Sequence, residues 1–482
     1  METDKLPDRQ SDRQTDSSEI NKMLPQINLI TMFRLGTFQM GLGMMTLLTL
    51  GVINRVMIDE LKVPASIAAG AIAMYQFVSP ARVWFGQMSD AKPIFGMHRT
   101  GYVWIGAFLF TTLSFVTLQV VWQLGISVDA NGWTTSSYTW AGLLAAMFAL
   151  YGLSLSMSST PFAALLVDIS DEDNRSKLVS IVWSMLMVGI IIGAIVSSGL
   201  LKQLGLNAEL AELQASINRL FILIPAIVFS LAIFATFGVE QKYSRYRIRS
   251  VVADREDKIT LATALKILTA SRQTAIFFFF VLTMTVSLFM QDAILEPYGG
   301  EVFQMEISQT TRLNAFYGMG TLIGIACTGF LIVPRLGKQK TAKFGCIAAS
   351  VCSGLFIVAG FVGQPGMLMG ILVLFGLLSG ILTAGVLSLM LDLTAAETAG
   401  TFIGAWGLAQ AIARGLSTVL GGGMLDIGRI LFTEPVLAYG TVFATQAIGM
   451  LLSITLLDRV NIQEFRDNAR LAIMTVMEGE LD

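Results

Sequence analysis

Apolar residues are gathered into long, nearly uncharged stretches, and most charged residues lie between these stretches. Each stretch holds about 20 residues, the length that an α-helix needs to cross the hydrocarbon core of a bilayer. Strands of a membrane barrel would give alternating segments of about 10 residues, whereas the runs here are continuous. Because hydrocarbon forces a spanning segment to satisfy its own backbone hydrogen bonds, the pattern predicts an all-α membrane protein.

The pattern predicts twelve transmembrane helices. We place them at residues 31–53, 66–85, 101–124, 139–166, 178–201, 218–238, 273–296, 313–333, 342–362, 367–391, 399–422 and 437–457.

Twelve spans put both termini on one side, and the distribution of Lys and Arg decides which side that is. With cytoplasmic termini, almost all basic residues outside the spans fall in the tails and inner loops. Apart from Arg55 at the end of span 1, the outer side then has only Lys62, Lys202, Arg219, Arg312 and Arg429. We therefore expect both termini to be cytoplasmic.

One long charged segment divides the spans six and six. The predicted organisation is a disordered cytoplasmic tail (1–28), a six-helix bundle (29–238), a cytoplasmic central loop (239–272), a second six-helix bundle (273–457) and a cytoplasmic C-terminal tail (458–482). A short internal match supports a duplication, since ALLVDISDEDNRSK after span 4 aligns with SLMLDLTAAETAGT after span 10 and pairs Asp168 with Asp392. A 6+6 arrangement of parallel repeats is the architecture of major facilitator transporters.

The segment after span 2, GQMSDAKPIFGMHR (86–99), resembles the facilitator loop signature G-x-x-x-D-(R/K)-x-G-(R/K)-(R/K). Gly86 and Asp90 match it, whereas Lys92 and Arg99 are displaced from the usual spacing. An ordinary charged cytoplasmic turn would also explain the two basic residues. The Gly86 and Asp90 pair favours the facilitator fold and a gating role for this loop.

Ionisable groups inside spans cost about 2.5–3.5 kcal/mol each on insertion scales, so each is a candidate for function. Asp292 and Glu296, four residues apart in span 7, are expected on one helical face, with Pro297 ending the helix and placing Glu296 at the membrane edge or the mouth of a cavity. Arg414 lies near the middle of span 11. A pairing of either carboxylate with Arg414 stays open, as does a role in binding a proton, a cation or a pigment.

Three further polar residues belong to span 1. Arg34 is close enough to the cytoplasmic end to extend into the interface. Asn54 and Arg55 lie at the outer end, where Arg55 is expected to pair with Asp59 in an i,i+4 cluster. By contrast, Gly189 and Gly193 in span 5 form a GxxxG motif, which predicts close helix packing rather than ligand binding.

Composition narrows the function classes. Hydrophobic residues make up 54% of the 482 residues and charged residues only 14%, against about 25% in a soluble domain. A net charge of −2 argues against nucleic acid as a partner. The three cysteines lie in apolar runs, and His98 is the only histidine, so we expect no metal site.

Enzymatic activity is not expected either. The chain has no Walker A sequence and no set of residues suited to nucleophilic catalysis. The nearest acidic cluster, Asp168, Asp171 and Asp173, has the spacing of a solvated turn that caps a helix.

Three segments, 33–70, 77–106 and QDAILEPYGGEVF (291–303), closely resemble the PucC family, a branch of the major facilitator superfamily in phototrophic bacteria. The resemblance implies a protein that handles chlorophyll or bacteriochlorophyll as bound cargo and assists the assembly of light-harvesting complexes. It implies light-harvesting or photosystem subunits and pigment-synthesis proteins as partners, in a photosynthetic or cytoplasmic membrane. No pigment ligand is implied at a particular residue.

Two hypotheses follow. The chain is a facilitator-fold assembly factor that binds or delivers pigment, or it is a proton-coupled secondary transporter of a small or amphipathic solute in which Asp292, Glu296 and Arg414 couple protonation to alternating access.

Overall fold

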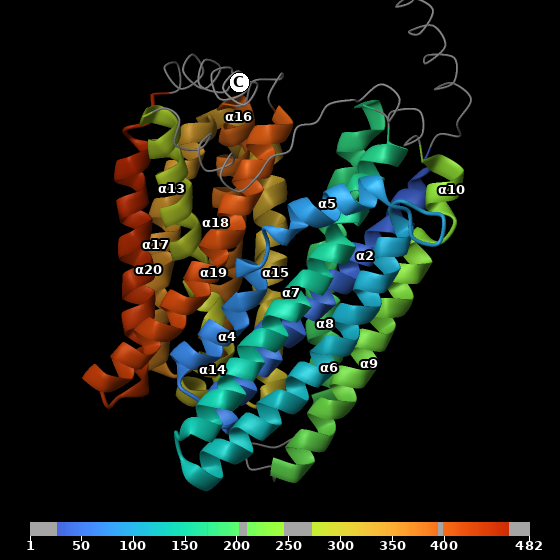
Figure 1. The fold of residues 1–482 in the computed structure, drawn as a ribbon. Helices are drawn as coiled ribbons and strands as arrows, with labels where there is room; N and C mark the ends of the chain where they lie inside the picture. Colours follow the sequence, from blue (N-terminus) through green and yellow to red (C-terminus); the bar gives the residue numbers. More distant parts are fainter. Residues whose placement is uncertain (1–26, 171, 202–209, 245–271, 394–398, 462–482) are drawn as a thin grey trace, which may run out of the picture.

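The computed structural model describes residues 27–170, 172–201, 210–244, 272–393 and 399–461, and in these ranges the chain is almost entirely helical. Long slanting helices form two groups, with the first half of the chain on the right of Figure 1 and the second half on the left. The all-helical fold class is therefore confirmed. Residues 1–26, 245–271 and 462–482, most of the predicted tails and central loop, lie outside the described residues.

In the first half, the elements coincide with the expected spans 1 to 6. They are α2 (Leu29–Thr46), η1 (Leu47–Val52), α3 (Ile53–Arg55), η2 (Val56–Glu60), α4 (Ala65–Phe77), α5 (Ala81–Ala91), α6 (Thr100–Asn131), α7 (Thr135–Ile169), α8 (Glu172–Leu201), α9 (Leu210–Thr236) and the short α10 (Val239–Tyr243). The first residues of the predicted central loop are thus helical.

In the second half, the elements coincide with expected spans 7 to 12. They are α13 (Arg272–Phe289), η3 (Met290–Ala293), α14 (Leu295–Phe303), α15 (Ile307–Cys327), η4 (Thr328–Ile332), α16 (Val333–Leu336), α17 (Lys338–Val362), α18 (Pro365–Leu393), α19 (Ala399–Leu431) and α20 (Pro435–Leu457).

Within the described ranges, nine helical segments are long and apolar enough to cross a membrane, and Ala65–Phe77 is a shorter apolar helix. The expected spans 2, 8 and 11 are helical but do not meet that criterion. Span 2 is divided into α4 and α5 by a turn at residues 78–80, where Pro80 cannot donate a backbone hydrogen bond. The count of twelve spans and the cytoplasmic side of the termini stay predictions.

Helix packing repeats between the halves. In the first half α2 packs on α8 and α9, α6 on α7 and α9, and α4 on α7; in the second half α13 packs on α19 and α20, α17 on α18 and α20, and α15 on α18. Each pair of packed spans in the first half corresponds to the pair of spans numbered six higher in the second half. The halves meet where α4 lies against α19 and where α15 lies against α8. These two contacts are also counterparts, as a repeated six-helix unit produces.

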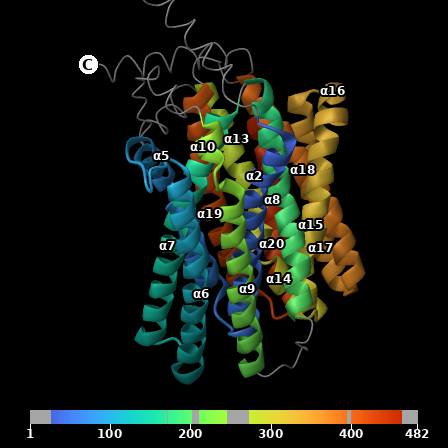
Figure 2. The same cartoon turned by 90° about the vertical axis from the view of Figure 1, so that its right-hand side faces the viewer.

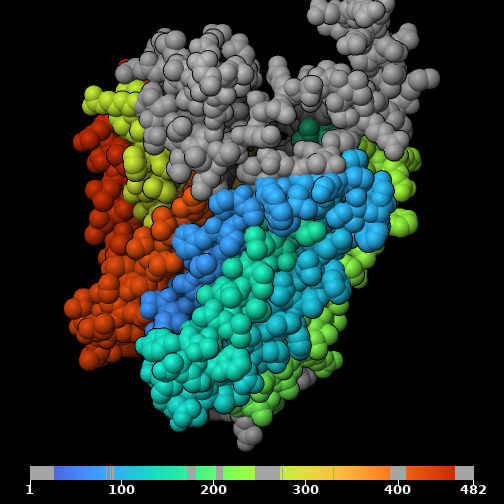
Figure 3. All heavy atoms as spheres, viewed as in Figure 1, coloured from blue at the N-terminus to red at the C-terminus, as the bar shows by residue number. Residues whose placement is uncertain are grey.

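Figure 2 shows the helices running roughly parallel along one axis, which is the membrane normal for helices of this length. In Figure 3 the blue α4 and the orange α19 adjoin along the boundary between the halves. The short elements α5, α10 and α16 lie at one end of the molecule and α14 at the other. On the predicted topology these are the cytoplasmic and the outer ends.

Regular α-helix is interrupted in spans 1 and 7, which occupy equivalent places in the two halves. Span 1 contains the π-helical segments η1 and η2, and span 7 changes from α13 to the 3₁₀ turn η3 before α14 begins. The interruptions face each other, because η1 contacts η3 and α14. Paired interruptions of this kind indicate a binding or gating region in transporter folds.

The GxxxG motif of α8 packs closely, as predicted. A Cβ added at Gly189 would collide with the backbone carbonyl of Met40 on α2, and one at Gly193 would lie 3.0 Å from Cα of Met44. These contacts bring the backbones of spans 1 and 5 together, because neither glycine has a side chain to hold the helices apart.

Replacing Gly189 with Ala should lower thermal stability, because the backbone of α2 cannot move without disturbing span 1. Overpacking of this kind costs about 1–3 kcal/mol. The apparent melting temperature of the detergent-solubilised protein measures the effect. Gly199→Ala on the same helix is the matched control, because nothing lies within 4 Å of a Cβ added there. Equal melting temperatures for the two variants would contradict the packing argument.

Candidate functional site

Arg55 joins the two halves at the outer end of the interface. Its guanidinium is buried and donates hydrogen bonds to the hydroxyl of Thr310 and, at 2.9 Å, to the carbonyl of Met305, both in the second half. Within its own span, Nε lies 3.6 Å from Asp59 and 4.0 Å from Glu60. The predicted i,i+4 pair is therefore present, but Arg55 also makes contacts across the interface that sequence reasoning did not anticipate.

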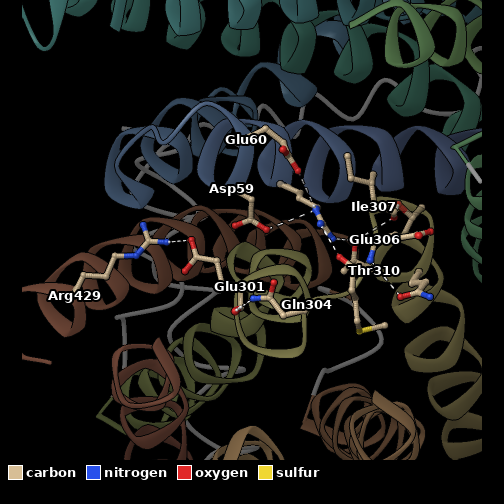
Figure 4. Close-up of polar contacts among 12 residues, drawn as sticks. Asp59, Glu60, Glu301, Gln304, Glu306, Ile307, Thr310 and Arg429 are labelled. Carbon is tan, nitrogen blue, oxygen red and sulfur yellow. Dashed lines mark hydrogen bonds and ion pairs between the residues drawn. The ribbon is translucent and has the colours of Figure 1, made fainter. Parts of the chain in front are cut away.

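Figure 4 shows how these groups gather at the outer end. Glu301 on α14 pairs with Arg429 on α19 at 2.5 Å, and Gly300 lies against the side chains of Arg55 and Asp59. Neither oxygen of Asp59 has a hydrogen-bond partner in the described chain. The two acidic groups on span 1 therefore interact with Arg55 through charge rather than through hydrogen bonds. We call Arg55, Asp59, Glu60, Glu301 and Arg429 the outer cluster.

Asn54 forms a hydrogen bond with the backbone at the interruption of span 7. Its side-chain amide donates to the carbonyl of Ala293, at the end of the 3₁₀ turn η3. A break in a helix leaves backbone groups without intrahelical partners. Asn54 supplies a donor to one of them from the other half, so the predicted intramembrane candidate has a structural partner here.

Asp426 on α19 caps a helix of the opposite half. Its two carboxylate oxygens accept from the backbone amides of Ala65, at 3.0 Å, and Ser66, at 2.8 Å. These are the first residues of α4, whose own N-cap residue, Pro64, has no side-chain acceptor. A carboxylate at a helix N-terminus satisfies free amides and complements the helix dipole. Asp426 therefore links α4 to α19 at the same end as Arg55.

The structure does not place Asp292 and Glu296 on one helical face. The α-helix ends at Phe289, before either residue, and α14 begins at Leu295. Pro297 lies inside the first turn of α14, where a missing N–H costs nothing, so the expectation that it ends the helix was wrong. The interruption lies upstream and turns the two carboxylates toward different neighbours.

Glu296 is buried, with 3% of its surface exposed, rather than at a membrane edge or cavity mouth. Asn314 on α15 donates to one carboxylate oxygen at 2.6 Å, and Gly51 in η1 packs against the same oxygen. The other oxygen has no hydrogen-bond partner within the described ranges. The nearest cationic influence is Arg55 rather than Arg414.

A second group of polar residues lies deeper in the interface. Arg414 interacts electrostatically with Tyr75 on α4, Asp292 in η3 and Tyr317 on α15. Arg82 on α5 interacts in turn with both Tyr75 and Arg414. We call these five residues the central site, because they come from both halves and from four different spans.

Side chains of the central site keep solvent-accessible surface although they belong to the interior of a membrane protein. Tyr75, Asp292 and Tyr317 are partly exposed, and Arg414 and Arg82 are exposed. Arg414 lies over the ring of Phe289, 4.2 Å from its centroid. Within the described chain it makes no ion pair with Asp292 or Glu296, so the pairing left open by the sequence is an electrostatic interaction with Asp292 only.

The predicted gating loop forms a network at the end of the molecule that the predicted topology makes cytoplasmic. Arg99 is buried, with Nε donating to Asp168 on α7 at 2.8 Å and Nη1 to the hydroxyl of Ser89 at 2.6 Å. Glu240 on α10 accepts from the backbone amides of residues 98–100 and caps α6. These contacts tie the loop to spans 3, 4 and 6 of the first half.

The other loop candidates contribute less. The Lys92 side chain is exposed, and its carbonyl accepts from the hydroxyl of Tyr102 at 2.9 Å. A Cβ at Gly86 would make an ordinary contact with Thr160 at 3.6 Å, so close packing does not require glycine there. The side chain of Asp90 lies outside the described part of the structure.

Arg34 has a structural partner instead of reaching toward the interface of the membrane. Its guanidinium donates to the carbonyls of Phe234, at 2.7 Å, and Phe237, at the end of α9. A cation at a helix C-terminus is favourable. Arg34 therefore fastens span 1 to span 6.

Sequence reasoning missed Asp426, Asn314, Thr310 and Glu240. Asp426 was placed in a loop because span 11 was ended at residue 422, whereas α19 continues to Leu431. A signal was present: span 2 begins after Pro64, which cannot cap it, so its first amides required an acceptor from elsewhere.

A family model described as PUCC protein matches residues 52–465, and this match covers most of the chain. The chain belongs to the PucC family. Among curated relatives of this PucC-family protein, Protein PucC of Rhodobacter capsulatus is 28% identical over 440 residues, covering 89% of this chain and 92% of the relative. The bacteriochlorophyll synthase 44.5 kDa chain of the same species is 28% identical over 466 residues, covering 94% and 99%.

Solved structures similar to this PucC-family protein are membrane transporters. A bacterial homologue of the iron transporter ferroportin in its inward-facing state gives a TM-score of 0.66 at 14% identity, covering 90% of this chain and 99% of that one. A bacterial homologue of the human lysosomal transporter Spinster, also inward-facing, gives 0.60 at 12%, covering 93% and 98%. At these identities the likeness shows the fold alone, which is that of the major facilitators.

Asp426→Ala should loosen the outer end, because it removes two charge-assisted hydrogen bonds between the halves. Such bonds contribute about 1.5–3 kcal/mol each, so losing both should make the outer end open at least about a hundredfold more often. A cysteine introduced at the buried Met305, in a background lacking the three native cysteines, reports opening through its rate of maleimide labelling. Asp458→Ala is the control, because its ion pair with Lys343 lies within one half. An unchanged labelling rate in Asp426→Ala would contradict a role of Asp426 in holding the outer end closed.

Proposed function

We propose that this PucC-family protein binds or delivers chlorophyll or bacteriochlorophyll and assists the assembly of light-harvesting or photosystem complexes. The family match over residues 52–465 carries this proposal. One relative supports the pigment connection by its name, the bacteriochlorophyll synthase 44.5 kDa chain. The proposed place is a photosynthetic membrane, and the proposed partners are antenna or photosystem subunits and pigment-synthesis proteins.

The mode of action in this proposal is binding followed by transfer, without catalysis. The central site supports it, since its polar groups come from both halves and keep accessible surface inside the membrane region. Aromatic rings lie on both sides of it, with Tyr75 paired to Tyr151 in the first half and Tyr317 stacked on Phe375 in the second. Rings of this kind suit a large planar cargo.

The protein purified in mild detergent from its native pigmented membrane should carry pigment and subunits of a pigment complex. An absorption spectrum measures the pigment, and identification of the co-purifying subunits measures the partners. An unrelated multi-span protein purified from the same membrane controls for carry-over. A colourless preparation without such subunits would refute the proposal.

A proton-coupled secondary transporter is the second candidate. One observation favours it: Asp292 lies in the interrupted part of span 7 and interacts electrostatically with Arg414 across the central site. Intramembrane carboxylates at such positions serve as proton sites in transporters. The interruption of the equivalent span 1 is consistent with this arrangement.

Asp292→Asn separates the two candidates. On the assembly proposal the variant should fold normally and change the amount of its co-purifying pigment or subunits several-fold, because Asp292 belongs to the central site. In proteoliposomes containing a trapped pH-sensitive dye, neither it nor the wild type should then carry protons. Asp458→Asn at the cytoplasmic end is the matched control. Proton flux that is present in the wild type and absent in Asp292→Asn would instead establish the transporter.

A further inference from the structure

Arg414 has an unmatched charge in a place where unmatched charges are costly. It lies near the middle of α19, a helix of 33 residues, and among the described residues its guanidinium has no hydrogen bond and no ion pair. Its guanidinium carbon lies 4.2 Å from the centroid of the Phe289 ring. An arginine inside a membrane protein ordinarily pairs with an acid, a carbonyl or a ligand. Arg55 and Arg99 of this chain follow that rule, because each is buried among several acceptors.

The surroundings of Arg414 add to the positive charge rather than cancel it. Arg82 is exposed and interacts electrostatically with Arg414. Among the described residues, Asp292 is the carboxylate that interacts with Arg414, and it offsets at most a single positive charge. The central site therefore has a net positive charge, with tyrosine hydroxyls from both halves beside it. That charge matches an anionic group such as a carboxylate, which arginine can bind through two parallel hydrogen bonds.

Aromatic side chains flank this charge on both sides of the interface. Phe289 lies under the guanidinium, and Tyr75 and Tyr317 approach it from α4 and α15. Aromatic side chains of this kind can stack on a flat ring system. A guanidinium beside such rings can bind a carboxylate through two parallel hydrogen bonds.

We infer that the central site recognises a carboxylate attached to a large planar ring system, with Arg414 as the anchor of the carboxylate. The class of ligand follows from the charge and the rings alone. Where the inference rests on the proposed function, it makes the cargo the free-acid form of the tetrapyrrole pigment, before its propionate is esterified, rather than the finished ester.

Matched acid and ester probes test the anchor independently of the cargo. Wild-type protein in detergent is titrated with 1-pyrenebutyrate and its methyl ester, and with chlorophyllide and its methyl ester, each followed by fluorescence or absorbance. Each acid should bind about tenfold more tightly than its ester, the effect of one charge-assisted pair. Arg414→Gln should remove the preference by weakening binding of the acid about tenfold, and Arg414→Lys should restore part of it.

Arg335→Gln is the matched control, because Arg335 is an exposed arginine on α16 at the cytoplasmic end of the same half. An unchanged melting temperature shows that Arg414→Gln folds. Acid and ester binding equally to the wild type, or an acid preference that survives in Arg414→Gln, would overturn the inference while pigment binding stands. If 1-pyrenebutyrate binds in a way that requires Arg414 but chlorophyllide does not bind, the anion site is supported and the proposal of a pigment cargo is refuted.

Discussion

The interface between the two halves depends on the buried guanidinium of Arg55. A charge removed from water is costly unless opposite charges and hydrogen-bond acceptors surround it, and hydrocarbon supplies neither. Span 1 provides the charge of Asp59 and Glu60, but the hydrogen bonds come from Thr310 and the carbonyl of Met305 in the other half. Closing the outer end is therefore the condition under which Arg55 is satisfied. Asn54 and Asp426 likewise make hydrogen bonds to the opposite half, Asn54 through its amide and Asp426 through its carboxylate.

This outer closure also accounts for the irregular helices beside it. Gly51 in η1 and Gly300 in α14 allow Glu296, Arg55 and Asp59 to approach the opposite backbone. Where regular α-helix is interrupted, donors from across the interface replace the lost intrahelical bonds, as Asn54 does for Ala293. Deeper in the interface the central site lacks such mutual satisfaction. There Arg414 and Arg82 stay exposed, and the polar groups are available to something other than the protein itself.

Much of the fold was predictable, because hydropathy reports directly on the length of helix that a bilayer requires. The pairing of Arg55 with Asp59 was predictable for a similar reason, since four-residue spacing places both on one helical face. The prediction from Pro297 was wrong because a proline disrupts a helix only when it lies in the helix interior. Pro297 lies in the first turn of α14, and the sequence does not reveal this until the break upstream of α14 is known. Asp426 escaped because its partners are backbone amides of a span more than 300 residues away in sequence. Contacts between halves depend on how the bundles dock, and periodicity within one span contains no information about that.

The distance along the chain between Arg55 and its partners has a consequence for biosynthesis. Thr310 follows Arg55 by 255 residues, which corresponds to roughly 10–50 s of translation at ordinary rates of about 5–20 residues per second. Span 1 must therefore enter the bilayer and wait there before the second half exists. During that interval Asp59 and Glu60 are the only counter-ions that belong to the same helix end. Their presence lets the first span tolerate its arginine until the ribosome has delivered the rest of the interface.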